Sequence, residues 1–345
     1  MTTPLPAFFN PKTVDSIRRV PYQTRALEAL TYAKEHSIPP ADADTTCVCL
    51  LAIDVQNTFC LPDFELFVGG RSGRGAIDDT RRLCEFIYRH LDLITEIVPT
   101  MDTHAAAAIF HAVFWINDAG EHPEPMTLIS YEDVEQGKWK VNPFVAERFT
   151  DRSAGSLEAF TLHYAKELSD RGKYPLTIWP YHSMLGGIGH ALVPAFEEAC
   201  FFHNLVRASQ TRFEVKGDNP LTENYSVLSP EVLDDPDNQP IAEKNSALIQ
   251  HLLSFDAVII AGQAKSHCVA WTVSDLLSEI KSVDPALAKK IYLLEDCTSP
   301  VVVPGVVDFT SEADSTYERF AQAGMNIVKS TEALESWPNF PLSVA

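Results

Sequence analysis

The chain has 345 residues, of which 46% are hydrophobic and 21% are charged, a balance typical of a globular protein with a large apolar core. Its 47 acidic and 27 basic residues give a net charge of -20, and no basic run offsets this charge. So acidic a surface disfavours nucleic acid and anionic membranes as partners.

The first 45 residues contain one predicted helix, 22–35, which ends before Pro39 and Pro40 because proline cannot continue a helix. We predict that 1–45 is an N-terminal extension. We further predict that 46–335 forms the main domain and that 336–345 is a C-terminal tail.

In the main domain, apolar runs typical of strands alternate with segments whose apolar residues have helical spacing. The predicted strands are 46–54, 93–101, 176–179, 213–216, 257–261, 290–294 and 326–328, the last at a sheet edge. The predicted helices are 76–91, 157–169, 190–204, 241–254, 269–280 and 309–323. This alternation predicts a three-layer α/β/α fold with a mostly parallel, Rossmann-like sheet.

Two stretches lack a periodic pattern. Residues 116–152 are polar and aromatic, and we interpret them as an insertion in the main domain. Residues 217–238 are rich in Asn, Pro, Asp and Ser. Loops this long in a compact domain are usually functional or disordered.

The seven cysteines lie mostly in apolar stretches, which indicates thiols in a reducing compartment rather than a disulfide framework. The first ten residues lack the pattern of a signal peptide, and the apolar runs are shorter than the roughly 20 residues that span a bilayer. We therefore expect a cytoplasmic location.

Ligands of parallel α/β sheets bind beyond the carboxyl ends of the strands. An acid, an amine and a thiol occur at such ends: Asp54, Lys216 and Cys268. Each alone has an ordinary explanation, respectively a helix N-cap, a surface lysine and a small buried hydrophobe. Their occurrence at one predicted sheet edge favours a catalytic role for all three.

Three segments resemble the motifs of the isochorismatase-like cysteine hydrolases. The first, 50–59 (LLAIDVQNTF), is a strand that ends in Asp and continues with Gln-Asn and an aromatic residue. The second, 213–228 (FEVKGDNPLTENYSVL), is similar to the family's lysine motif. The third, 259–277 (IIAGQAKSHCVAWTVSDLL), resembles the nucleophile motif, with Cys-Val opening a helix. The resemblance covers about 46–329.

This resemblance implies hydrolysis of a small amide through a thioester acyl-enzyme. Cys268 is the expected nucleophile, because the positive end of a helix favours a thiolate. Lys216 is the expected nearby cation, and Asp54 the expected general acid and base. The backbone N–H groups of Ala264 and Cys268 are expected to form the oxyanion hole, with a cis peptide bond between Gln263 and Ala264.

The resemblance also suggests residues that contact the substrate. Phe59 and Trp179 match family positions that sandwich an aromatic substrate ring, although ordinary core packing explains them equally well. Gln56, from the first motif, is the third residue expected in substrate binding.

Asp102-Thr103-His104 and Trp179-Pro180-Tyr181-His182 resemble the two metal-binding motifs of nicotinamidases within this family. The resemblance implies that Asp102, His104 and His182 hold a divalent metal, with Zn favoured and Mn or Fe as alternatives. It implies no organic cofactor. His111, seven residues after His104 on a predicted helix, is an alternative third ligand that we expect to be a structural or pocket-lining residue instead.

Several residues depart from the nicotinamidase pattern: Thr103 replaces a Trp, Ser183 replaces a Cys, and Lys265-Ser266 replaces a small residue and an acid. We expect Lys265 to place a cation near the pocket mouth and to favour an anionic substrate. The substrate is therefore nicotinamide or another small carbamoyl or ureido amide.

Two non-hydrolytic alternatives are a binding protein on the same fold and a redox-sensing thiol protein. The second would need a resolving cysteine near Cys268, and the sequence has none there. The family suggests a homo-oligomer.

Overall fold

The computed structural model describes residues 2–150 and 152–342, and the chain divides into two compact units. Unit 1 comprises Met1–Met101, Ala191–Glu214 and Ser246–Ala345, and unit 2 comprises Asp102–His190 and Val215–Asn245. Residue 1 of the predicted extension, residue 151 of the predicted insertion and residues 343–345 of the predicted tail lie outside the described residues.

The central sheet has six strands in the order β12-β9-β8-β1-β2-β7. Their bounds are Asn326–Val328, Ile291–Leu294, Ala257–Gly262, Val48–Ile53, Glu96–Asp102 and Glu214–Lys216 in that order. The pairs β12–β9, β9–β8, β8–β1 and β1–β2 are all parallel. All six residues of β1 are buried, as expected for a strand covered on both faces.

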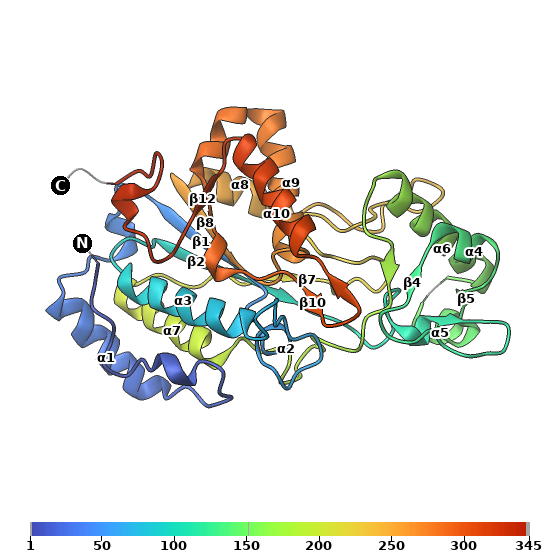
Figure 1. Cartoon of the computed structure of the whole chain (residues 1–345), viewed down its shortest axis with the longest axis horizontal. Coiled ribbons are helices and arrows are strands. Elements are labelled where there is room, and N and C mark those ends of the chain that lie inside the picture. The colour runs from blue at the N-terminus through green and yellow to red at the C-terminus, as the bar shows by residue number, and fades with distance from the viewer. Residues whose placement is uncertain (1, 151, 343–345) are drawn as a thin grey trace. The chain divides into compact units, whose positions relative to one another are not determined.

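Helices cover both faces of this sheet in unit 1, which confirms the predicted three-layer fold (Figure 1). On one face lie α1 (Tyr22–Glu35), α3 (Gly75–Arg89) and α7 (Pro194–Arg207). On the other face lie α8 (Ser246–Ser254), α9 (Cys268–Val283) and α10 (Thr310–Gln322). The bounds of α1 are those predicted, because the two prolines that follow it are an unambiguous stop signal.

Short elements complete unit 1. They are the helix α2 (Asn57–Cys60), the hairpin of β10 (Val302–Val303) and β11 (Val307–Asp308), and the 3-10 helices η1 (Pro11–Thr13), η2 (Ala41–Ala43), η4 (Pro285–Lys290), η5 (Glu295–Cys297) and η6 (Leu334–Ser336).

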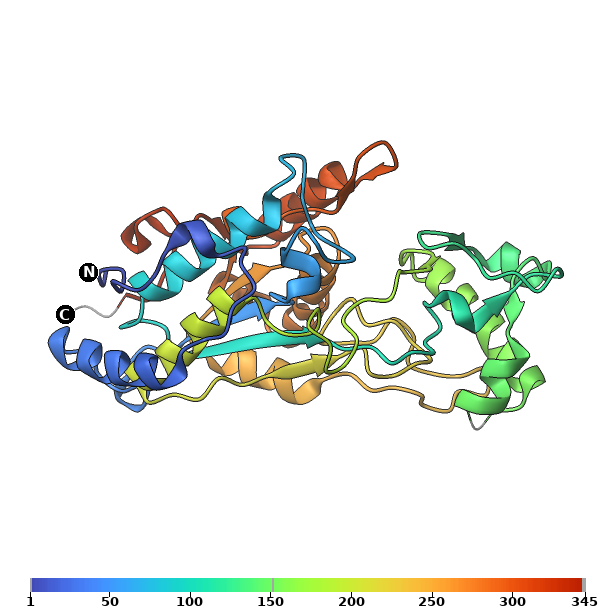
Figure 2. The same ribbon diagram turned by 90° about the horizontal axis from the view of Figure 1, so that it is seen from below.

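Unit 2 contains the predicted insertion, which has secondary structure of its own. Its elements are η3 (Ala112–Phe114), β3 (Trp115–Ile116), β4 (Leu128–Ile129), α4 (Tyr131–Glu135), β5 (Lys140–Val141), α5 (Pro143–Phe149), α6 (Ala154–Asp170) and β6 (Leu176–Thr177). Figure 2 shows these helices and short strands, in green, packed together.

One predicted strand of the central sheet is wrong. Residues 176–179 were expected in the parallel sheet, but β6 pairs antiparallel with β4 in a separate two-stranded sheet. A short apolar run indicates burial without revealing which strand it will pair with. The segment 179–182 therefore does not follow a strand of the central sheet.

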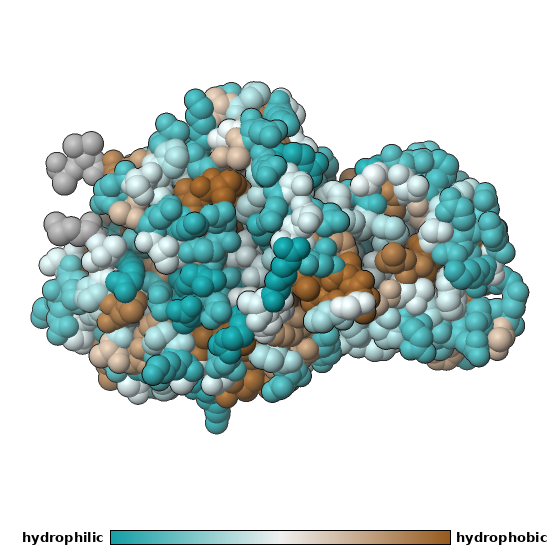
Figure 3. Space-filling model, in the orientation of Figure 1, coloured by the Kyte–Doolittle hydropathy of each residue, from teal (hydrophilic) through white to brown (hydrophobic). Residues whose placement is uncertain are grey.

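The face of the molecule in Figure 3 is mainly hydrophilic, and its hydrophobic residues form separate small patches. None of the seven cysteines forms a disulfide within the described part of the chain. Among residues 2–150 and 152–342, no helix combines the length and the hydropathy needed to cross a membrane.

The N-terminal segment packs into the core of unit 1. Tyr32 of α1 stacks edge to face on Phe202 of α7, with ring centroids 5.5 Å apart. Arg207 of α7 is fully buried, donates to the Pro39 carbonyl at 2.7 Å and forms an ion pair with Asp44. The segment predicted as an extension thus supplies both core contacts and the counter-charge of a buried arginine.

Because Asp44 neutralises a buried guanidinium, we predict that Asp44→Ala lowers the free energy of unfolding by about 3 kcal/mol or more. Denaturant unfolding measures this change. The matched control is Asp42→Ala, which removes an exposed carboxylate from the same segment and should change stability by less than about 0.5 kcal/mol. Equal effects of the two variants would contradict the role assigned to the buried pair.

Candidate active site

Asp54 directly follows β1 and is fully buried. Its backbone N–H donates to Thr100 Oγ1 at 3.0 Å, and that hydroxyl donates back to Asp54 Oδ1. Its φ of +48° is in the left-handed region, which costs a non-glycine residue free energy and commonly marks functional sites. The next helix has Gln56 as its N-cap, so the alternative that Asp54 caps a helix is wrong.

The loop before Cys268 begins beside Asp54. Gly262 ends β8 with φ of +115°, and a Cβ there would lie 2.0 Å from the Ile53 carbonyl oxygen. Only glycine permits this approach of two backbones. The Gln263 N–H donates to the same carbonyl at 2.8 Å, which fixes the start of the loop against the residue that precedes Asp54.

The peptide bond between Gln263 and Ala264 is cis, as predicted. The Ala264 carbonyl accepts from the N–H groups of His267 at 3.0 Å and Val269 at 3.2 Å. The Ala264 N–H donates to no group among the described residues. The loop therefore turns the carbonyl of Ala264 toward the helix start and leaves its N–H available to an acceptor.

Cys268 is the first residue of α9, and 9% of it is exposed. A thiol at this position lies at the positive end of the helix dipole, where a thiolate is favoured. Helix formation here agrees with the sequence, since the run from Val269 has helical spacing.

Lys216, the last residue of β7, is buried in unit 2. Its ammonium donates to Asp102 Oδ1 and to the Asn224 carbonyl, both at 2.8 Å. It is therefore not a surface lysine. Asp54 and Cys268 belong to unit 1, and the assembly of the three residues into one triad stays a prediction.

Asp102 is the centre of a buried polar cluster in unit 2. Besides Lys216, its carboxylate lies 3.1 Å from His104 Nε2 and 3.5 Å from His182 Nε2. Gly217 has φ of +82°, and a Cβ there would lie 3.0 Å from Asp102 Oδ1 and 3.2 Å from His104 Nε2. The glycine that follows Lys216 in the lysine motif thus leaves room for the cluster.

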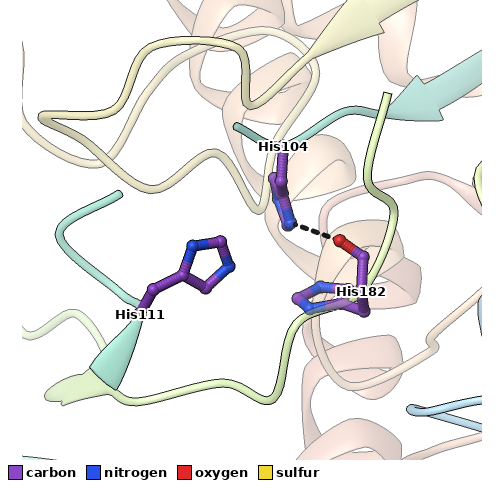
Figure 4. Close-up of side chains that lie close together, drawn as sticks. All are labelled: His104, His111 and His182. Carbon is purple, nitrogen blue, oxygen red and sulfur yellow. Dashed lines mark hydrogen bonds between the residues drawn. The ribbon is translucent and has the colours of Figure 1, made fainter. Parts of the chain in front are cut away.

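Two histidines of the cluster are oriented by backbone carbonyls, and Figure 4 shows the contact between His104 and the His182 carbonyl. His104 Nδ1 contacts the His182 carbonyl at 3.2 Å, and His182 Nδ1 contacts the Pro180 carbonyl at 2.8 Å. Each imidazole therefore uses Nδ1 for the backbone and turns Nε2 toward Asp102. Histidine metal ligands are usually oriented in this way, with the ring nitrogen that does not face the metal bonded to a backbone carbonyl or a carboxylate.

His111 completes a group of three histidines whose ring nitrogens lie within 4.8 Å of one another (Figure 4). It is fully buried, and both ring nitrogens lack a hydrogen-bond partner among the described residues. A buried polar group without a partner is costly unless it binds a ligand. The helix predicted for this histidine is wrong, because His111 precedes η3 and bridges to Trp179.

The protonation of the cluster follows from burial and charge. Burial disfavours ionisation of Asp102, but the charges of His104 and Lys216 hold its pKa well below the usual range. Burial and the charges of His104 and His182 lower the pKa of His111 to about 3, so this imidazole is neutral at pH 7. An anionic carboxylate in a cluster with the neutral His111 imidazole is compatible with a divalent metal.

Glu223 is a buried acid that the sequence analysis missed. Burial raises the pKa of its carboxyl to about 7, and the charge of His104 opposes this shift. Its Oε1 accepts from the Asn224 N–H at 3.1 Å. The sequence TENYS gave no signal, because an acid in a polar loop is normally exposed.

The expected substrate residues lie in both units. Gln56 is fully buried and bridges to Leu192, and Phe59 of α2 is part of the unit 1 core. Trp179 is in unit 2, with its ring centroid 6.4 Å from those of His182 and Tyr225. The core contacts of Phe59 agree with the packing alternative, and the substrate roles stay predictions.

The expected role of Lys265 is not supported. Its ammonium forms an ion pair with Asp314 at 2.6 Å and lies 4.5 Å from the Tyr317 ring centroid. Only 12% of its side chain is exposed. Because α10 supplies both partners, this cation binds the loop to a helix of its own unit.

Comparison with solved structures identifies the fold. The yeast nicotinamidase Pnc1p, bound to the inhibitor nicotinaldehyde, matches 82% of this chain and 99% of its own, with 20% identity and a TM-score of 0.50. The Acinetobacter baumanii nicotinamidase matches 84% of this chain and 98% of its own, with 17% identity and a TM-score of 0.49.

An isochorismatase-like hydrolase from Alkaliphilus metalliredigens matches 83% of this chain and 95% of its own, with 13% identity and a TM-score of 0.40. No family model and no curated protein matches the chain. At these identities the likeness concerns the fold alone. The chain has the three-layer α/β/α fold of the yeast nicotinamidase.

We predict that the purified protein contains one divalent metal ion per chain, and that His104→Ala and His111→Ala each weaken metal affinity at least about tenfold. Elemental analysis and chelator competition measure this. His122→Ala, which removes an exposed histidine of the same unit, is the control. Retention of metal by both cluster variants would contradict the assignment.

Proposed function

We propose that this protein is a cysteine amidohydrolase that cleaves a small amide to the carboxylic acid and ammonia, with nicotinamide as the first candidate substrate. The observation that carries this proposal is the loop from Gly262 to Cys268. It leads from Ala264, whose N–H is available to an acceptor, to the Cys268 thiol at the start of α9, and it begins against the residue before Asp54. A non-catalytic binding protein would not need this combination.

In the proposed first step, Asp54 accepts the thiol proton and Cys268 sulfur attacks the amide carbonyl carbon. The N–H groups of Ala264 and Cys268 stabilise the resulting oxyanion. The C–N bond then breaks, Asp54 returns the proton to the leaving amine, and a thioester remains.

In the second step Asp54 accepts a proton from water, which attacks the thioester. The carboxylic acid is released and the thiol is restored. Lys216 supplies positive charge that stabilises the anionic groups of the site. The hydrogen bond from Thr100 holds the Asp54 carboxylate in one orientation for both steps.

We propose Asp102, His104, His111 and His182 as the ligands of a divalent metal, with Zn favoured and Mn or Fe as alternatives. When bound, the ion would supply a Lewis acid that can coordinate a substrate atom such as a ring nitrogen. His111 extends the ligand set expected from the sequence. Its two buried ring nitrogens without partners support its inclusion.

A related amidase acting on another small carbamoyl or ureido compound is the second candidate. Thr103, which replaces the family's tryptophan, contacts His190 Nε2 through its hydroxyl at 2.8 Å. A threonine–histidine pair in place of an indole makes the surroundings of the metal ligands more polar. Partners other than the substrate, a homo-oligomeric state and a cytoplasmic location stay predictions.

We predict that the wild type releases ammonia from nicotinamide and that Cys268→Ala lowers kcat at least about 10³-fold. Cys47→Ala is the matched control, because it removes the thiol that is not buried and should leave kcat unchanged. Asp54→Asn should also abolish turnover, since the amide cannot accept the thiol proton.

Two further measurements separate the parts of this proposal. Turnover that is lost on chelation and restored by Zn would support the metal role. Rapid labelling of Cys268 by iodoacetamide without turnover of nicotinamide would direct the substrate search to other small amides. A wild type that hydrolyses no amide and whose Cys268 does not react would exclude the mechanism.

A further inference from the structure

A buried polar network in unit 1 includes Gln263, which belongs to the loop that precedes Cys268. Gln263 Nε2 donates to Asp79 Oδ2 at 2.9 Å, and Arg82 donates to Asp79 Oδ1, also at 2.9 Å. The Ser299 N–H donates to Gln263 Oε1 at 3.3 Å. Gln263 and Asp79 are 2% and 3% exposed, so burial makes each of these hydrogen bonds costly to lose.

The network fixes the side chain of Gln263 at both ends. Its amide nitrogen is held by a carboxylate from α3, and its amide oxygen by the backbone after β9. The carboxylate is held in turn by Arg82, whose Nε donates to the Asp296 carbonyl. A buried, fully paired network of this kind restricts its members to one arrangement.

The residues on either side of Ala264 are also anchored through the backbone. Gln263 donates its N–H to Ile53, and Lys265 donates its N–H to the Ser299 carbonyl at 2.9 Å. Gly75, at the start of α3, makes room for this contact, since a Cβ there would lie 2.5 Å from Ser299 Oγ. Between these anchors the Ala264 N–H makes no hydrogen bond among the described residues.

We propose that Asp79 is a positioning residue for the oxyanion hole, acting through the side chain of Gln263 to aim the Ala264 N–H at the developing oxyanion. This inference rests on the proposed function. Asp79 does not touch the substrate. Its carboxylate fixes the residue that shares a peptide group with the Ala264 nitrogen.

The protonation of Asp79 gives this role a pH dependence. Burial raises the pKa of the Asp79 carboxyl to about 6, and hydrogen bonds from Ser299 and Gln263 and the charge of Arg82 oppose the shift. Below this pH the Asp79 carboxylate is protonated and loses its negative charge, which weakens its hydrogen bonds with Gln263 and Arg82. The contribution of Asp79 to kcat is therefore present above about pH 6 and decreases as the pH falls through that value.

The thiols and the phenol near Asp79 do not ionise between pH 5 and 8, because burial raises the pKa of each far above this range. Arg82 supplies the positive charge beside the Asp79 carboxylate. These neighbours are Arg82 of α3, Cys60 of α2, Cys297 of η5 and Tyr317 of α10.

The test compares Asp79→Ala, Asp79→Asn and Gln263→Leu with Asp78→Asn. Asp78 is the preceding residue of α3, but its side chain is 33% exposed and pairs with Arg81, so it is a matched control. We expect Asp79→Ala and Gln263→Leu to lower kcat about 10- to 100-fold while KM changes less than about twofold. The double variant Asp79→Ala/Gln263→Leu should lose no more of its kcat than either single variant does.

Asp79→Asn is nearly isosteric and keeps an acceptor, so we expect a smaller loss of kcat. Its pH profile should lack the decrease near pH 6 that the wild type shows. Thermal unfolding of every variant, measured in parallel, shows whether the fold is retained.

Two reactions of Cys268 separate positioning from a general structural effect. Alkylation by iodoacetamide creates no oxyanion, so its rate should stay within about twofold of the wild type. Addition of the Cys268 thiol to nicotinaldehyde forms a carbon–sulfur bond and places the carbonyl oxygen in the oxyanion hole. The affinity for this aldehyde should fall in parallel with kcat.

The outcomes are distinguishable. If Asp79→Ala and Gln263→Leu keep wild-type kcat and aldehyde affinity, the positioning role is excluded and the proposed function stands. If alkylation slows as much as turnover, the network has a general structural role and the inference is wrong. If the wild type neither hydrolyses amides nor adds the aldehyde, the proposed function fails and this inference fails with it.

Discussion

The close contact between β1 and β8 is the constraint on which unit 1 depends. Gly262 allows the two backbones to approach more closely than any other residue would permit, and the Gln263 N–H then bonds to the Ile53 carbonyl. This contact joins the residue before Asp54, the proposed general acid, to the loop before Cys268, the proposed nucleophile. A side chain at Gly262 would push apart two strands that are buried on both faces, so the glycine is required by packing as well as by its φ.

The polar cluster of unit 2 depends on a different balance. Asp102 is buried at a cost, and Lys216, His104 and His182 offset that cost with positive charge and hydrogen-bond donors. The same carboxylate therefore links Lys216 to the histidines. A change at Lys216 would remove the cation and also alter the charge balance of the proposed metal ligands, and a metal analysis of the variant separates these two effects.

The sequence predicted most of the central sheet and its helices, because long periodic segments and the Pro39-Pro40 stop are local signals. It failed where the answer depended on tertiary pairing. The run at 176–179 is buried but pairs with β4, and His111 joins His104 through a bridge to Trp179 rather than through a helix. The role of Asp79 gave no signal at all, because an acid within a helix is normally solvated and only the folded chain shows that Gln263 covers it.

Unit 2 is made of two stretches that both precede residue 246, whereas β8, β9 and the helix that begins with Cys268 all follow it. During synthesis, the ribosome therefore completes the chain of the histidine cluster before it adds the nucleophile. The sheet of unit 1 forms later, because its central strand β1 lacks its partner β8 until more than 200 further residues have been added. Folding of unit 1 is consequently a late, long-range event, and the chain of the proposed metal site is complete before the proposed nucleophile has been added.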